Sequence, residues 1–373
     1  MLKTNINIKK KFFIIIIIIN CLIYYCFSQE NSTFLLGCQF NKGFIMKHSK
    51  KMEGIIPAYP YGINFYIHWQ KWDEQSWQYC FCYPRTGLVV HYNNFKSSPL
   101  GEAFAIFPYV EPILKAEKKI HSSMTFGIGP TFVSKIYDSI RNPQNICFSS
   151  HISFIVHGSA KLFYSLDKNL ELTFSISLNH ISNGGISKPN LGVNYILFAT
   201  GINYHFRPLE YTVERHKLSK NLLDYKKRYD VLIFFTAKTV DRGYKRYPGV
   251  GFNSGFSFVI GRINAILVNL EAVNDLSDKE YIRKNNILDE NNNYVDHKYF
   301  SCLLGHELLL GKFNFYQQLG YYIYSPYERR DRFYQRYGLN YYIKKNFFIG
   351  INLKAHREVA DFLDFRIGFS KKN

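Results

Sequence analysis

Beyond residue 28 the sequence has no uninterrupted apolar run of about 18 residues, the length that a helix needs to cross a lipid bilayer. Acidic residues are also scarce, since 28 Asp and Glu stand against 47 Lys and Arg and the formal net charge is +19. Four of the lysines lie in the first 28 residues, which leaves +15 for the rest. This balance suits an anionic partner such as a phosphorylated lipid surface. A general bias toward Ile, Lys, Asn, Tyr and Phe explains it equally well.

Cysteine is too sparse and too irregular to build a framework. Seven cysteines occur, of which five follow residue 28: Cys38, Cys80, Cys82, Cys147 and Cys302. Their number is odd and no two pairs have zinc-ligand spacing, so neither a disulfide scaffold nor a metal site is indicated, although one bridge remains open. We expect no cofactor.

The amino terminus has the layout of a secretory signal peptide over residues 1–28. Lys3 and residues 9–11 form a basic start, residues 12–25 form an apolar run, and Ser28 is a small residue before a plausible cleavage point. The apolar run is short for a retained membrane anchor, which is the less favoured alternative. Because an exported chain rarely meets nucleic acid, we expect no nucleic-acid partner.

The rest of the chain alternates between apolar and polar residues. From Leu170 to Asn179 every second residue is apolar, which indicates a strand with one apolar and one polar face. Similar segments recur and the chain is 18% aromatic. In an exported protein without apolar helices this pattern predicts an all-β, antiparallel transmembrane β-barrel. The expected strands lie at about 33–46, 60–70, 86–93, 102–114, 121–135, 149–165, 169–182, 192–206, 229–238, 249–260, 263–274, 297–310, 313–324, 333–343, 346–355 and 362–370.

Two polar residues continue the apolar face of the strand at 169–182. By the count of two, His180 and Ser182 lie on that face at its far end, and Asn194 is in phase with the apolar face of the returning strand. The connecting segment 183–192 is rich in Gly, Asn, Ser and Pro, which form turns. A hairpin therefore brings the three side chains to the same end of one wall. The alternative is a structural hairpin, in which Ser and Asn cap a turn and His belongs to an aromatic girdle.

The string His180-Ile181-Ser182-Asn183-Gly184-Gly185-Ile186, followed by Pro189-Asn190 and Gly192, resembles the signature of the outer-membrane lipid A 3-O-deacylases of the PagL type. The resemblance covers roughly residues 100–206. It implies an outer-membrane barrel esterase with a Ser-His-Glu triad on its outer surface, and a substrate in the lipopolysaccharide of the outer leaflet.

The resemblance assigns the nucleophile to Ser182 and the base to His180, and the family's Glu falls at Asn194. An amide can accept the ring N–H of a histidine and hold its tautomer, although it carries no charge. Asn183 and Asn190, with the backbone N–H groups near Gly184, are candidate oxyanion donors. The expected reaction is hydrolysis of an ester-linked 3-hydroxyacyl chain of lipid A.

The sequence leaves the arrangement of barrels open. We expect a deacylase-like region at 29–206, a charged linker or long turn at 207–228, and a strand region at 229–373. A single barrel of about 14–16 strands, completed by the C-terminal region, is preferred because it leaves no open edges. Two eight-stranded barrels in series are the alternative. A catalytically inactive barrel, either a channel or a structural protein, is the alternative function, and the oligomeric state stays open.

Overall fold

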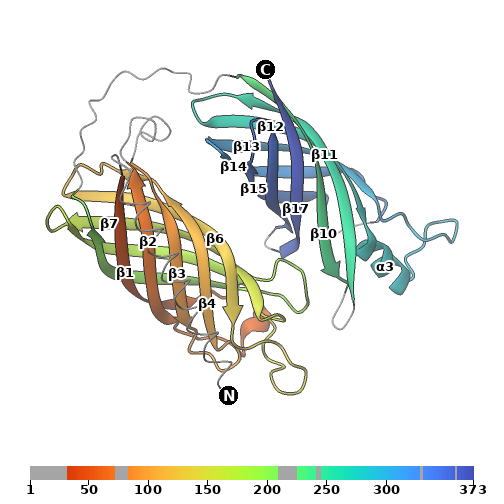
Figure 1. Cartoon of the computed structure of the whole chain (residues 1–373). Helices are drawn as coiled ribbons and strands as arrows, with labels where there is room; N and C mark the ends of the chain where they lie inside the picture. The colour runs from red at the N-terminus through yellow and green to blue at the C-terminus, as the bar shows by residue number, and fades with distance from the viewer. Residues whose placement is uncertain (1–31, 72–82, 209–224, 241–244, 328–330, 358) are drawn as a thin grey trace, which may run out of the picture.

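The computed structural model describes residues 32–71, 83–208, 225–240, 245–327, 331–357 and 359–373. Figure 1 shows that these residues form two separate barrels of antiparallel strands. The predicted signal peptide at residues 1–28 and most of the predicted linker lie outside the described residues, and the predicted domain boundaries stay predictions.

The first barrel is formed by strands β1 to β9. Neighbouring strands pair in the order β4-β3-β2-β1-β9-β8-β7-β6-β5, so that β1 pairs with β9. The barrel closes because β4 also pairs with β6. The short 3-10 helix η1 (Lys50–Met52) lies between β1 and β2. The strands are β1 (Ser32–Ile45), β2 (Tyr61–Lys71), β3 (Arg85–Asn94), β4 (Glu102–Glu111), the two-residue β5 (Ile113–Leu114), β6 (Ile120–Val133), β7 (Ile152–Ser165), β8 (Leu170–Ser182) and β9 (Val193–His205).

The second barrel has eight strands and closes by pairing of β10 with β17. Its helix α3 (Leu276–Lys284) follows β12 directly, and the Asp275 side chain caps it by accepting a hydrogen bond from the Ser277 backbone N–H. The strands are β10 (Lys227–Thr239), β11 (Arg246–Val259), β12 (Asn264–Asp275), β13 (Tyr299–Leu310), β14 (Phe313–Tyr324), β15 (Phe333–Tyr342), β16 (Phe347–His356) and β17 (Val359–Lys372).

The predicted all-β, antiparallel barrel fold is confirmed. Of the two arrangements, the chain adopts the pair of barrels in series, and the preferred single barrel of 14–16 strands is corrected. The physical reason is that each set of strands satisfies its own edges. Residue Leu36 of β1 pairs with Tyr204 of β9, and Val231 of β10 pairs with Phe369 of β17, so no edge is left for the other barrel.

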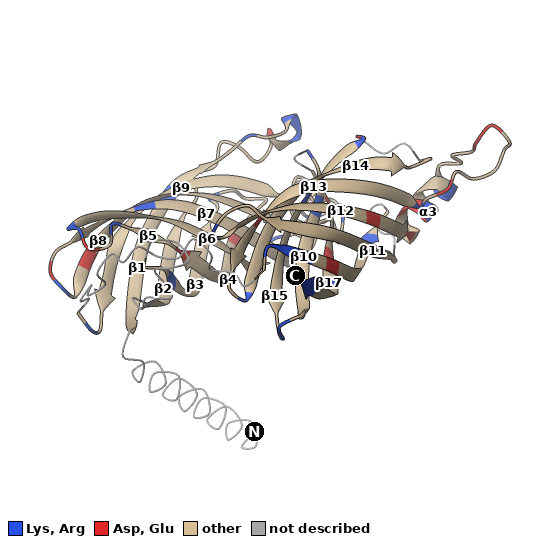
Figure 2. Cartoon of the chain, turned by 90° about the horizontal axis from the view of Figure 1, so that it is seen from above, with Lys and Arg blue, Asp and Glu red and all other residues tan. Residues whose placement is uncertain are grey.

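Both barrels carry apolar side chains outside, and their interiors hold buried polar and charged side chains together with clusters of buried apolar ones. Exposed residues of the outer walls include Phe65, Phe104, Phe174, Ile176 and Phe198 in the first barrel, and Ile233, Phe252, Leu270, Leu319 and Phe365 in the second. An apolar outer wall of this kind is typical of barrels that contact lipid. No helix in the described part of the chain is long and apolar enough to cross a membrane. In Figure 2 the strands carry few charged residues and many charges lie in loops.

Buried ion pairs fill the interiors. In the first barrel Arg85 Nη1 lies 2.6 Å from Glu171 Oε1, and in the second Arg336 Nη2 lies 2.6 Å from Glu271 Oε1. Arg85, Arg228 and Arg336 are among the largest side chains that are fully buried. Because charge buried in a protein needs a partner, these networks fix the register of the strands across each interior.

Candidate active site

His180, Ser182 and Asn194 lie together at one end of the first barrel. His180 and Ser182 are on β8, and His180 is the direct cross-strand partner of Asn194 on β9. Leu178, two residues earlier on the same face of β8, is exposed on the outer wall. The alternation of the strand places His180 and Ser182 on the same face of β8 as Leu178, with His180 partly exposed and Ser182 buried.

The Asn194 side chain holds the imidazole of His180. Nδ1 of His180 lies 2.5 Å from Oδ1 of Asn194. An amide oxygen can only accept, so in this pair Nδ1 carries the proton and donates it. The other ring nitrogen, Nε2, is then the basic one. This is the tautomer that a general base needs, because its free lone pair can take a proton from a hydroxyl.

Ser182 is two residues from His180 on the same face, a separation of about 6.6 Å along a strand. Its exposed fraction is 9%, so the side chain is largely screened from solvent. Among the residues that the structure describes, no hydrogen bond joins Ser182 to His180. Catalytic hydrogen bonds often tighten only when substrate is bound.

Gly192 packs against both catalytic candidates. It has a φ of +70°, and a Cβ at this position would lie 2.8 Å from Cε1 of His180 and 3.2 Å from Cβ of Ser182. Only glycine gives this close approach together with a left-handed backbone. The motif residue Gly192 thus has a steric role that the sequence did not assign.

The candidate oxyanion donors differ in whether hydrogen bonds within the loop already occupy them. The side-chain amide of Asn183 donates to Ser149 Oγ at 3.1 Å and to the Ser187 carbonyl at 2.8 Å, so it is engaged in holding the loop. Asn190 Oδ1 accepts the backbone N–H of Asn183 at 2.9 Å. Gly184, with a φ of +64°, is buried directly after Asn183. Among the described residues, its backbone N–H and the side-chain N–H groups of Asn190 have no hydrogen-bond partner, which keeps them as candidate oxyanion donors.

A segment at 46–60, which the sequence argument missed, supports the site from the other side. The Met46 backbone N–H donates to the Asn194 carbonyl oxygen at 2.8 Å, and His48 Nε2 lies 3.3 Å from the Leu191 carbonyl oxygen. The basic cluster Lys47, His48, Lys50 and Lys51 gave a signal that could have drawn attention to this segment.

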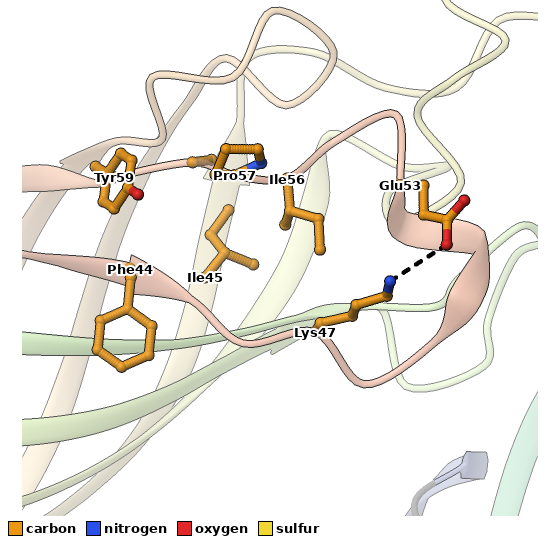
Figure 3. A pocket seen from close by; sticks show the side chains of 8 residues that line it. Phe44, Ile45, Lys47, Glu53, Ile56, Pro57 and Tyr59 are labelled. Carbon is orange, nitrogen blue, oxygen red and sulfur yellow. Dashed lines mark hydrogen bonds and ion pairs between the residues drawn. The ribbon is translucent and has the colours of Figure 1, made fainter.

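A pocket of about 470 Å³ lies beside this segment (Figure 3). Its lining is mainly apolar, with Phe44, Ile56 and Tyr59 among the residues around it, and Lys47 forms an ion pair of 3.2 Å with Glu53 at one side. Phe44 pairs with Ile196, two residues from Asn194, so the pocket is close to the candidate site.

Cys147 lies behind the site but is unsuited to be the nucleophile. Its backbone carbonyl oxygen accepts the Gly192 N–H at 3.2 Å, and its side chain is fully buried. Burial raises the pKa of the Cys147 thiol to about 12, which leaves almost no thiolate at neutral pH. In the described part of the chain, no three His, Cys, Asp or Glu side chains gather as metal ligands.

The fold defines the chain as a pair of antiparallel β-barrels with the apolar outer walls of barrels that contact lipid. Residues 58–203 match the family described as lipid A 3-O-deacylase (PagL), and residues 227–373 match the acyloxyacyl hydrolase C-terminal domain. The chain therefore belongs to the PagL family of lipid A 3-O-deacylases, as the resemblance predicted.

Solved structures give further similarities. The crystal structure of the outer-membrane enzyme PagL matches with 15% identity over 44% of this chain and 97% of its own, with a TM-score of 0.34. The toluene transporter TodX of P. putida matches with 9% identity over 93% of this chain and 91% of its own, with a TM-score of 0.18. A deletion mutant of the same channel matches with a TM-score of 0.20. No curated protein sequence matches significantly.

Proposed function

We propose that the protein is an esterase that removes an ester-linked 3-hydroxyacyl chain from lipid A. The observation that carries the proposal is the hydrogen-bonded pair His180–Asn194 beside Ser182 on the lipid-facing wall. A soluble enzyme would have little use for a nucleophile and base on an apolar outer surface, whereas an enzyme acting on membrane lipid needs them there.

In the proposed mechanism Ser182 Oγ attacks the ester carbonyl while Nε2 of His180 takes the hydroxyl proton. The tetrahedral intermediate expels the sugar hydroxyl, which receives that proton from His180, and an acyl-enzyme remains. Water, activated by the same nitrogen, then releases the fatty acid. Asn194 keeps the imidazole in the required tautomer, and the Gly184 N–H and the Asn190 amide are the proposed oxyanion donors.

The position of the site suits the depth of the substrate. From Leu170 to Leu178 the outer wall extends about 26 Å along the strand, and strand tilt shortens this to roughly 20 Å of membrane height. His180 and Ser182 follow immediately, at the level where glycolipid ester bonds are expected. The basic residues Lys50 and Lys51 are exposed next to the site, where they can attract lipid phosphates.

The alternative functions are a channel and a structural barrel. Arg85 and Arg336 are fully buried and form ion pairs across the interiors of the first and second barrel. These side chains leave little space for a water-filled pore. A channel is therefore the weaker proposal. A structural barrel would not need an imidazole held by a cross-strand amide beside a serine.

Mass spectrometry of lipid A incubated with the purified full-length protein tests the proposal. Loss of one hydroxyacyl mass, together with release of the free hydroxy fatty acid, is the expected result. Intact lipid A after prolonged incubation with correctly folded protein would reject it. The same measurement identifies which acyl position is cut.

A further inference from the structure

The loop 183–192, which follows the candidate nucleophile, lies between the two barrels. On one side it contacts the 134–151 segment of its own barrel, where the Leu191 N–H donates to the Ile146 carbonyl oxygen at 3.1 Å. On the other side it contacts the second barrel. Lys188 Nζ donates to the backbone carbonyl oxygen of Val240 at 2.8 Å.

A second contact with the C-terminal barrel is steric. Gly185 has a φ of +83°, and a Cβ at this position would collide with the backbone carbonyl oxygen of Asp361. A Cβ on the neighbouring Gly184 would lie 3.3 Å from Cβ of Leu363. The start of β17 therefore packs directly on the two glycines, one of which carries a proposed oxyanion N–H.

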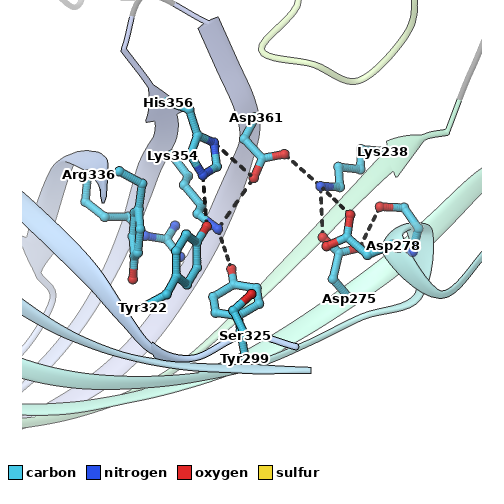
Figure 4. Close-up of polar contacts among 12 residues, drawn as sticks. Lys238, Asp275, Asp278, Tyr299, Tyr322, Ser325, Arg336, Lys354, His356 and Asp361 are labelled. Atoms are coloured by element: carbon cyan, nitrogen blue, oxygen red, sulfur yellow. Dashed lines mark hydrogen bonds and ion pairs between the residues drawn. The ribbon is translucent and has the colours of Figure 1, made fainter. Parts of the chain in front are cut away.

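The contacting segments of the second barrel are themselves held by an ionic cluster (Figure 4). Lys238 Nζ lies 2.7 Å from Asp361 Oδ1 and 2.9 Å from Asp275 Oδ2, which ties the end of β10 to the starts of β17 and α3. Val240 is two residues beyond Lys238. The backbone that contacts loop 183–192 is therefore held in place by the ion pairs of Lys238.

A third contact lies farther along the walls. The rings of Phe126 on β6 and Phe315 on β14 have centroids 5.4 Å apart. Contacts at both positions indicate that the two barrels meet along their sides, with loop 183–192 at one end of the contact.

We propose that the C-terminal barrel is a positioning element of the active site, and that the backbone at Val240 and Asp361 holds loop 183–192 in its working conformation. The inference rests on the proposed function for its catalytic consequence. Whether the second barrel orders this loop can be tested without measuring activity. It assigns a role to the second barrel, whose own His356 faces the interior and has no serine two residues later.

Hydrogen exchange of the full-length protein in detergent micelles tests the structural content. In Lys188→Met we expect the amides of residues 183–192 to exchange at least about tenfold faster, because a charge-assisted hydrogen bond is lost. Lys188→Arg, which retains a cationic donor, should keep most of the protection. Lys168→Met, at an exposed lysine of the opposite end, is the matched control and should leave exchange unchanged.

Gly185→Ala provides an independent test from the steric contact. It should also accelerate exchange in loop 183–192, whereas Gly311→Ala, at another glycine with a φ of +70°, imposes similar backbone strain far from the loop and should not. Unchanged exchange in both Lys188→Met and Gly185→Ala overturns the inference.

Turnover of lipid A in the same variants tests the catalytic content. We expect kcat to fall roughly tenfold in Lys188→Met with KM within about twofold of the parent, because the lost contact orders the loop rather than binding substrate. Faster exchange with unchanged kcat would overturn the positioning role. If the parent itself releases no fatty acid, the proposed function fails, and the exchange data alone decide whether the second barrel orders the loop.

Discussion

Nδ1 of His180 and Oδ1 of Asn194 lie 2.5 Å apart across the β8–β9 pair, so an uncharged amide stands where the PagL family resemblance places a carboxylate. The cross-strand register fixes this pairing, and the amide fixes the tautomer. What the amide lacks is the negative charge that stabilises the imidazolium formed during catalysis.

Restoring the charge should therefore raise turnover. Because a carboxylate stabilises the imidazolium that forms during catalysis, we expect Asn194→Glu to raise kcat by at least about tenfold. Asn194→Ala should lower kcat because the ring loses its orienting acceptor. Steady-state release of hydroxy fatty acid measures both. Equal rates for parent, Asn194→Ala and Asn194→Glu would show that Asn194 has no part in the reaction.

Gly192→Ala should damage the site more than the fold. The new Cβ would press on the His180 ring at 2.8 Å and take a strained backbone conformation, which costs of order 1–3 kcal/mol. We expect kcat to fall at least about tenfold while the protein still migrates as a folded, heat-modifiable barrel. A parent-like kcat would mean that the ring position tolerates displacement.

The basic segment beside the site should contribute to binding of anionic lipid. Lys50 and Lys51 are exposed, and a lysine near an anionic membrane surface contributes about 1 kcal/mol. The double variant Lys50→Gln/Lys51→Gln should therefore raise KM for lipid A at low salt roughly tenfold or more. High salt should narrow the difference.

The matched control for this charge change is Lys115→Gln/Lys118→Gln, at exposed lysines of the opposite end of the barrel. It should leave KM unchanged at every salt concentration. Equal effects of the two double variants would mean that overall charge, rather than the segment beside the site, attracts the lipid.

Lys238→Met should destabilise the second barrel strongly. The substitution leaves the buried Asp275 without the ammonium that pairs it, while Asp361 keeps Lys354 at 3.5 Å, and breaking a buried ion pair typically costs about 3–5 kcal/mol. Urea unfolding in micelles measures the effect. Lys312→Met, at an exposed position, is the control and should change the free energy of unfolding by less than about 0.5 kcal/mol.

Much of this fold is predictable from the sequence. Alternation with a period of two places Phe174, Ile176 and Leu178 outside, and the structure has them exposed on β8. The same count brings His180 to the outer wall opposite Asn194. Local pattern suffices here because side-chain direction in a strand depends only on parity.

The grouping of the strands into two barrels is harder to predict from the sequence. Alternation is the same whether β9 pairs with β1 or with a strand of the C-terminal half, because closure depends on long-range pairing and shear. The contacts of Lys188 with Val240 and of Gly185 with Asp361 are likewise hidden, since they join residues of different barrels. Asn183 shows a third limit, because the sequence does not reveal which acceptors a loop side chain finds.

The most direct test of the account compares the parent with Ser182→Ala, both folded as judged by heat-modifiable migration, on purified lipid A. We expect the parent to release a hydroxy fatty acid and Ser182→Ala to lower the rate by several orders of magnitude, because no other group described beside His180 replaces the hydroxyl. Release at the parent rate by Ser182→Ala would contradict the central claim that Ser182 is the nucleophile.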